Sequence, residues 1–217
     1  MGVYIRAGTR PSLLALKQVE IIQGYLEGLK FDIVPIETKG DKDKVRPLFL
    51  EDGTDFFTYE IEQALLDRKI DIAVHSAKDL EKNMPNELVV PCITRSPERR
   101  DCLVSSRGFT LDELPQGSVI GASSKNRKDS IARYRKDLVV KNIRGNIDER
   151  FDQLHRGDFD ALIVAYIALI RLGYEKKASQ VVPFDIIEPH LLQGSIAIQV
   201  RKDRYDLLEA FRGIDGK

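Results

Sequence analysis

The chain has 217 residues, of which 42% are hydrophobic and 31% charged, proportions that are ordinary for a folded globular protein. Lys plus Arg and Asp plus Glu both number 34, so the overall charge gives no reason to expect nucleic acid or an acidic membrane surface as a partner. The N-terminus enters a strand pattern without a signal peptide, and no stretch approaches the length of a membrane span. We therefore expect a cytoplasmic protein of one large or two modest domains.

Strand and helix patterns alternate through the first ninety or so residues. The expected strands are 3–5, 31–36, 70–74 and 88–90. A helix follows the first strand, with Thr9 as its expected cap and Pro11 in its first turn. The polar run 39–46 is expected to be a mobile loop, and a second helix covers 57–65. This order predicts an α/β fold.

The stretch from Ile70 to Asp79 organises the first half of the chain. A short apolar run is followed at once by four polar residues, His75, Ser76, Lys78 and Asp79. An open α/β sheet binds its ligand outside the carboxyl ends of its strands, which is where these side chains would lie. The ammonium of Lys78 would also help the Asp79 carboxylate to stay ionised in a partly dry cleft. A solvated strand end explains the same pattern equally well.

A second α/β unit follows a Pro-rich and charged crossover at 91–100. Its expected strands are 103–105, 118–121, 138–140 and 161–164, and a returning strand is expected at 193–200. Asn146 and Glu149 have the spacing of a capping box at the start of a helix. A last helix is expected over 203–211.

Basic side chains stand next to small or capping residues at three expected helix starts, near Arg10, Ser123 and Arg144. A helix N-terminus with a guanidinium beside it suits an anion, and several such sites suit a ligand with several carboxylates or phosphates. Capped helices with surface arginines remain the alternative. The sequence has no phosphate-binding GxxxxGK[ST] motif, no dinucleotide fingerprint and no metal-ligand spacing.

Taken together, the motifs resemble the porphobilinogen deaminase (hydroxymethylbilane synthase) family. The most specific are HSxKDL at 75–80 and RGNxxxR at 144–150. The matching stretches follow the order of the family and cover nearly the whole chain: 6–18, 57–66, 71–80, 100–105, 121–124, 144–150, 171–173 and 193–194.

The resemblance implies an α/β fold of two domains like those of type II periplasmic binding proteins, joined by two crossovers, with a ligand cleft between them. Domain 1 would comprise 1–94 plus 193–217, and domain 2 would comprise 98–190. Members of the family are transferases of tetrapyrrole and haem biosynthesis, which join four porphobilinogen molecules head to tail and release ammonia at each step. No nucleic acid or membrane partner is implied.

The resemblance also implies the site residues. Asp79 matches the catalytic carboxylate, which hydrogen-bonds pyrrole N–H groups and stabilises the cation left by deamination. The residues that match substrate-binding and cofactor-binding positions are Arg10, Ser12, Gln18, Phe57, Ser76, Lys78, Ser123, Ser124, Arg127, Arg144, Gly145, Arg150, Arg171 and Gln193.

Three departures from the family pattern bear on function. The family grows its product on a dipyrromethane primer, attached by a thioether to a cysteine of a third domain. This chain stops where that domain is expected to begin, and neither Cys92 nor Cys102 matches the attachment position. Asn126 replaces the first arginine of the GTSSxRR turn, and His190 and Leu192 replace smaller residues of PAxGQG.

Two hypotheses remain open. The first is a shortened deaminase, whose primer is held without a covalent bond or whose third domain comes from a separate chain. The second is a non-catalytic module that binds a pyrrole carboxylate or another polyanion. Asp79 favours the enzyme, because a binder of carboxylates gains nothing from a negative charge in its site. The missing attachment cysteine favours the binding module.

Overall fold

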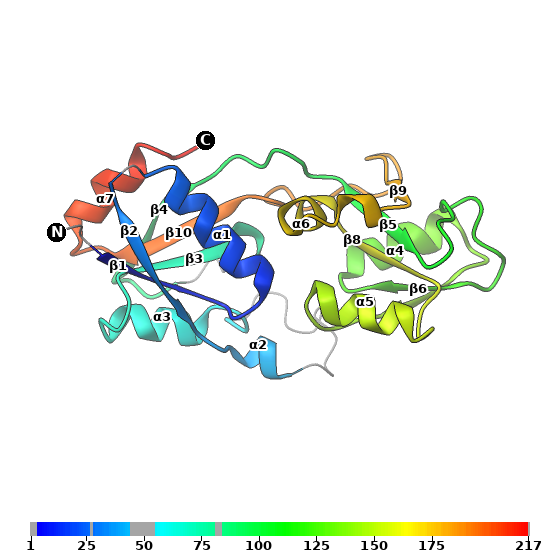
Figure 1. Cartoon of the computed structure of the whole chain (residues 1–217), viewed down its shortest axis with the longest axis horizontal. Helices are drawn as coiled ribbons and strands as arrows, with labels where there is room; N and C mark the ends of the chain where they lie inside the picture. Colours follow the sequence, from blue (N-terminus) through cyan, green and yellow to red (C-terminus); the bar gives the residue numbers. More distant parts are fainter. Residues whose placement is uncertain (1–3, 27, 44–54, 81–83, 217) are drawn as a thin grey trace. The chain divides into compact units, whose positions relative to one another are not determined.

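The computed structural model describes residues 4–26, 28–43, 55–80 and 84–216. These residues form two compact α/β units. Unit 1 contains the described residues up to Pro97 and from Leu192 onward, and unit 2 runs from Glu98 to Leu191. Among the residues that the structure describes, the chain crosses between the units at 97–98 and at 191–192 (Figure 1).

Unit 1 is built on a mixed five-stranded sheet in the order β2-β1-β3-β10-β4. Its strands are β1 (Tyr4–Thr9), β2 (Lys30–Pro35), β3 (Ile72–Ser76), β4 (Leu88–Ile93) and β10 (Ile196–Arg201). β1 pairs in parallel with β2 and β3, whereas β10 is antiparallel to β3 and β4. The carboxyl ends of β1 and β3 therefore lie at the same edge of the sheet.

Helices cover both faces of this sheet. The helices of unit 1 are α1 (Leu13–Gly24), α2 (Lys39–Lys42), α3 (Tyr59–Leu66) and α7 (Tyr205–Arg212), of which α1, α3 and α7 pack on the sheet. Val19 of α1 and Phe211 of α7 pack with Ile72 in one buried cluster, and Ile61 of α3 packs with Ala73 in another. Because Ile72 and Ala73 are neighbours in a strand, their side chains point to opposite faces. This places α3 on the face opposite α1 and α7 (Figure 1).

Unit 2 repeats this arrangement with the sheet order β7-β6-β8-β5-β9. Its strands are β5 (Asp101–Ser105), β6 (Val119–Ala122), β7 (Val139–Asn142), β8 (Ala161–Ala165) and β9 (Gln180–Val181). β6 is parallel to β7 and β8, and β5 is antiparallel to β8, so β5 has the place in this sheet that β10 has in unit 1. The helices are α4 (Lys125–Tyr134), α5 (Ile147–His155) and α6 (Tyr166–Leu172).

The predicted strands and helices occur in the expected order, but three local predictions were wrong. Ser12, not Thr9, caps α1, because Thr9 is still the last residue of β1. Pro11 disfavours helical backbone at Arg10, so the helix cannot begin as early as Thr9. Pro11, expected in the first turn, lies before the cap, because α1 begins at Leu13. Lys39–Lys42, expected in a mobile loop, forms α2 instead, while 44–46 of that loop lie outside the described residues.

The local prediction at 146–149 was confirmed. Asn146 and Glu149 form the expected capping box, in which each side chain accepts a hydrogen bond from the backbone N–H of the other residue. No helix in the described part of the chain is long and apolar enough to cross a lipid bilayer.

Candidate functional site

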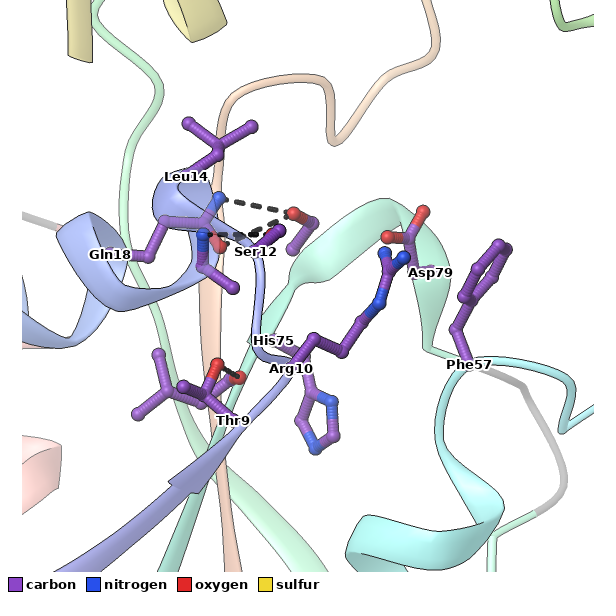
Figure 2. Close-up of a pocket in the computed structure, with 11 residues that line it drawn as sticks. Thr9, Arg10, Ser12, Leu14, Gln18, Phe57, His75 and Asp79 are labelled. Atoms are coloured by element: carbon purple, nitrogen blue, oxygen red, sulfur yellow. Dashed lines mark hydrogen bonds between the residues drawn. The ribbon is translucent and has the colours of Figure 1, made fainter. Parts of the chain in front are cut away.

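A small pocket lies at the carboxyl ends of β1 and β3 (Figure 2). The turn after β1, the first turns of α1, the end of β3 and the 3-10 turn Ala77–Asp79 supply most of its wall. The lining residues are Thr9, Arg10, Ser12, Leu14, Ala15, Gln18, Phe57, Val74, His75, Ser76 and Asp79. Six predicted site residues of unit 1 thus come together: Arg10, Ser12, Gln18, Phe57, Ser76 and Asp79.

The start of α1 supplies polar groups to this pocket. Ser12 Oγ accepts a hydrogen bond from the backbone N–H of Ala15 at 3.3 Å, which fixes the first turn of the helix. One turn further on, the Gln18 amide donates to Ser76 Oγ at 3.0 Å, although only 4% of Gln18 is exposed. This contact ties α1 to the end of β3 and orients both polar side chains.

Arg10, Phe57 and Asp79 converge at one end of the pocket (Figure 2). The Arg10 guanidinium carbon lies 4.2 Å from the centre of the Phe57 ring, within the range of a cation–π contact. Asp79 is half-buried and follows β3 directly. The pocket thus joins a cation, an aromatic face and a carboxylate, which suits a flat aromatic ligand that carries acidic groups and an N–H donor.

A chain of buried polar groups lies beside the pocket. His75 Nε2 is 3.2 Å from Gln199 Oε1, and the Gln199 amide donates to Glu62 Oε1 at 2.8 Å. Burial lowers the pKa of His75 to about 4, so the imidazole is neutral at neutral pH. Burial also raises the pKa of Glu62. The neutral ring lies on the α3 side of the sheet and adds no positive charge next to Asp79.

In unit 2, Ser124 caps α4 and accepts a hydrogen bond from the backbone N–H of Arg127. The Arg127 guanidinium is buried and donates to both oxygens of Asp101, from Nε at 2.9 Å and from Nη2 at 2.6 Å. Arg127 was predicted to bind a carboxylate of the ligand. The Nε–Nη2 edge of its guanidinium is instead occupied by the Asp101 carboxylate. Sequence reasoning missed this pair because its members lie 26 residues apart.

Arg150, Ser123 and Gly145 meet at the start of α5. The Arg150 guanidinium donates to the Gly145 carbonyl at 2.8 Å and to Ser123 Oγ at 3.1 Å. Gly145 has φ of +101°, and an added Cβ would lie 2.8 Å from the Glu149 carboxylate, so this turn requires glycine. Three predicted site residues, Arg150, Ser123 and Gly145, are thus connected by hydrogen bonds in unit 2.

Arg144 lies next to this group and lines an open hollow of about 390 Å³. The residue is 8% exposed, so its charge has little contact with bulk water. The other lining residues are Asn142, Gly145, Glu149, Asp152, Gln153 and Arg156. A ligand carboxylate here would meet a largely desolvated cation, which strengthens an ion pair.

The remaining predicted residues lie outside these two groups. Lys78 is exposed beside Asp79, Gln193 is buried just before β10, and Arg171 is half-buried in the last turn of α6. In the other direction, five lining residues of the pocket were not among the predicted substrate-binding or catalytic residues: Thr9, Leu14, Ala15, Val74 and His75. Of these, His75 carried a signal, because it stands among the polar residues that end β3.

Both cysteines are buried in strands, Cys92 in β4 and Cys102 in β5. Burial raises the pKa of the Cys92 thiol to about 11 and that of the Cys102 thiol to about 12. The thiolate is the form that reacts, so neither side chain is suited to form a thioether at neutral pH. In the described part of the chain, no group of three or more His, Cys, Asp or Glu side chains could hold a metal ion.

We therefore expect Cys92→Ser and Cys102→Ser to leave ligand affinity within about twofold of wild type, since neither thiol lines the pocket. Each variant should lower the free energy of unfolding by about 1–3 kcal/mol, because a hydroxyl replaces a buried apolar group. Isothermal titration calorimetry with porphobilinogen, the ligand that the sequence resemblance implies, and a urea titration measure the two effects. Loss of a bound pyrrole chromophore in either variant would contradict this prediction.

Comparison with known proteins adds evidence that is independent of the geometry. A family model described as "Porphobilinogen deaminase, dipyromethane cofactor binding domain" matches residues 5–209. The chain is 40% identical over 219 residues to the porphobilinogen deaminase of Brevibacillus brevis, covering 99% of this chain and 71% of that protein. It is 41% identical over 215 residues to that of Pelotomaculum thermopropionicum, covering 97% and 69%.

Solved structures at low sequence identity share the fold. One is the probable amino-acid ABC transporter extracellular-binding protein of Bacillus subtilis, with a TM-score of 0.54, 14% identity and coverage of 99% of this chain and 90% of that chain. Another is the VFT2 domain of Bordetella pertussis BvgS, with a TM-score of 0.53, 13% identity and coverage of 96% and 85%. The fold is therefore that of the type II periplasmic binding proteins, which confirms the expected fold class.

Proposed function

This chain belongs to the porphobilinogen deaminase family, and we propose that it joins porphobilinogen molecules head to tail with release of ammonia. One observation carries the proposal. Asp79 lies in the same pocket as Arg10, Ser12, Gln18 and Phe57, so a carboxylate and a set of hydrogen-bond donors meet at one place. A site that only bound carboxylates would be weakened by Asp79.

The donors of both units suit the acidic groups of porphobilinogen. In unit 1 these donors are Arg10, Ser12 and Gln18 around the pocket. In unit 2, Arg144 lines the hollow, and Arg150 is held in place by Gly145 and Ser123. We propose that these residues bind acetate and propionate groups, because guanidinium pairs with carboxylate in bidentate geometry.

Asp79 would act on the charge that forms during deamination. The C–N bond of the substrate's ammoniomethyl group breaks, and ammonia leaves with the bonding electron pair. The positive charge then spreads over the pyrrole ring, and its N–H becomes a stronger hydrogen-bond donor. A carboxylate that accepts this hydrogen bond stabilises the cation more than the neutral ring, which is electrostatic catalysis.

The described residues fit a dipyrromethane as a bound group but not as an attached one. The donor set suits its carboxylates, whereas Cys92 and Cys102 are buried with raised pKa values. When bound, a dipyrromethane supplies the pyrrole carbon from which the product grows. We propose that these residues hold the primer through its carboxylates, and that neither Cys92 nor Cys102 forms its thioether. Its length is about 70% of that of the relatives above.

The test is turnover by the 217-residue chain itself. Ammonia release and formation of the linear tetrapyrrole are measured from porphobilinogen, with and without added dipyrromethane. If activity requires added primer, the chain is a deaminase that binds its primer without a covalent bond. If activity appears without added primer, the chain is a deaminase that has retained a primer from expression. Intact mass separates a covalent adduct from a dissociable one. If the chain binds porphobilinogen but shows no turnover under either condition, it is a non-catalytic binding module and the proposal is wrong.

Binding gives a second check, through Arg144. Loss of one partner from a desolvated charge pair typically costs about 2–5 kcal/mol, so we expect Arg144→Ala to weaken porphobilinogen binding by tens-fold or more. Affinity in wild type should also fall as salt rises from about 0.05 to 0.5 M. The control is Arg133→Ala, which removes the same charge from an exposed position on α4. Equal affinities for both variants and wild type would exclude Arg144 from the site.

A further inference from the structure

The Arg10 guanidinium is held by a carboxylate that sequence reasoning did not include in the site. Asp41 Oδ1 accepts from Arg10 Nε at 3.0 Å and from Nη2 at 2.5 Å. The pair is well sheltered, since 27% of the Arg10 side chain and 13% of the Asp41 side chain are exposed. The contact is therefore less screened than an ordinary surface ion pair.

The second oxygen of Asp41 fixes this carboxylate to its own segment. Asp41 Oδ2 accepts from the Thr38 backbone N–H at 3.1 Å and from Thr38 Oγ1 at 2.8 Å, and Thr38 is fully buried. Because both oxygens have donors, the carboxylate cannot rotate away from Arg10 without losing the contacts at the start of α2. Asp41 is thus a rigid partner for the guanidinium.

The segment that carries Asp41 is itself packed on the pocket wall. The Gly40 backbone N–H donates to the Phe56 carbonyl at 2.9 Å, and Lys39 N–H donates to the Glu60 carboxylate at 3.2 Å. A Cβ added to Gly40 would lie 2.1 Å from the Phe57 ring, so the backbone of α2 rests directly on this ring. The same packing of α2 against Phe57 therefore positions both the Phe57 ring, which Arg10 contacts, and the Asp41 carboxylate.

This arrangement changes the charge balance at the end of β3. Arg10 is the guanidinium that converges with Asp79, and without Asp41 its positive charge would offset the Asp79 carboxylate (Figure 2). Pairing with Asp41 offsets the positive charge of Arg10, so Arg10 competes less with a ligand for the Asp79 carboxylate. Asp41 accepts along the Nε–Nη2 edge, which leaves the Nη1 side of the guanidinium to a ligand carboxylate.

We propose that Asp41 is a positioning residue: it holds Arg10 against the Phe57 ring and neutralises it, so that Asp79 acts on the positive charge of the substrate. The inference rests on the proposed function, in which Asp79 stabilises the cation left by ammonia. Asp41 touches no reacting atom and acts only through Arg10.

The main test is Asp41→Asn, which keeps the shape and one acceptor but removes the charge. Arg10 then turns toward Asp79, and we expect kcat for porphobilinogen to fall about 10- to 100-fold. KM should stay the same or fall, because a net positive charge favours the substrate carboxylates. Asp41→Glu restores the charge and should recover part of kcat. The matched control is Glu37→Gln, which removes a carboxylate from the exposed ion pair with Lys42 in the same region.

A spectroscopic measurement reads the contact without turnover. The Arg10 Nε–H signal in a 1H–15N NMR spectrum is assigned by its loss in Arg10→Lys. We expect slow hydrogen exchange of this signal in wild type and Glu37→Gln, and fast exchange in Asp41→Asn. Unchanged exchange in Asp41→Asn, or a rise in KM at constant kcat, would overturn the positioning role. Slow exchange in a wild-type chain that neither binds nor converts porphobilinogen would show instead that the proposed function is wrong, and the inference would fail with it.

Discussion

Asp79→Asn is expected to lower turnover of porphobilinogen by about 100- to 1000-fold, the size of effect seen when one preorganised electrostatic group is removed from an active site. Asparagine keeps the shape and one acceptor oxygen but cannot offset a full positive charge. Because the cation exists only once ammonia has left, the substitution acts on the transition state more than on the bound substrate. Porphobilinogen affinity should therefore hold or increase, since repulsion of its carboxylates disappears.

The control for this experiment is Asp67→Asn, which neutralises an exposed carboxylate of unit 1 that pairs with Lys69. Initial rates of ammonia release and calorimetric affinities are compared for the three proteins, with primer added. A large loss of rate at unchanged affinity in Asp79→Asn alone fits the proposed role. If Asp79→Asn turns over as fast as wild type, the carboxylate has no part in the chemistry. If affinity falls in step with rate, Asp79 binds the ground state instead.

Asp101→Ala is expected to lower the free energy of unfolding by about 3–5 kcal/mol, because it removes the carboxylate that accepts two hydrogen bonds from the buried Arg127 guanidinium. The exposed fractions of these two side chains are 8% for Arg127 and 1% for Asp101, so water cannot replace the lost partner. Urea unfolding followed by circular dichroism measures the change. The matched control is Asp129→Ala, which breaks the exposed Lys125–Asp129 pair on α4 and should cost less than about 1 kcal/mol.

A double variant separates the charge effect from a packing effect. Arg127→Met with Asp101→Leu removes both charges together, so its stability should lie well above that of Asp101→Ala. If the double variant is no more stable than the single one, lost packing rather than an unpaired charge explains the effect. If Asp101→Ala does not fold, Asp101→Asn replaces it in this comparison, because asparagine keeps the side-chain volume and removes only the charge.

The patterns that depend on neighbouring residues were readable in the sequence. The apolar run of β3, the helical spacing of α1 and the Asn146–Glu149 capping box each need only a few adjacent positions, and all three are present. The expected cap at Thr9 failed because two signals competed there. A capping residue stood in a suitable place, but the proline two positions later kept the backbone extended.

The partners of the charged side chains were not readable in this way. Arg10 pairs with Asp41 and Arg127 pairs with Asp101, across 31 and 26 residues, so no local spacing connects them. The motifs therefore indicated which residues gather at strand ends, but not which carboxylates of the chain already hold the arginines. The run 39–46 was expected to be a loop because of its polarity, whereas packing of Gly40 on Phe57 stabilises a helical turn there.

The place of β10 in the sheet of unit 1 has a consequence for synthesis on the ribosome. β10 is an inner strand that joins β3 to β4, yet it comes after the whole of unit 2 in the chain. The described part of unit 2 lies in one stretch from 98 to 191, so it can fold while translation continues. Until 196–201 emerge, the facing edges of β3 and β4 lack their partner, and these edges are exposed to pairing with other chains. During translation, unit 2 can therefore be complete while the sheet of unit 1 still has two unpaired strand edges.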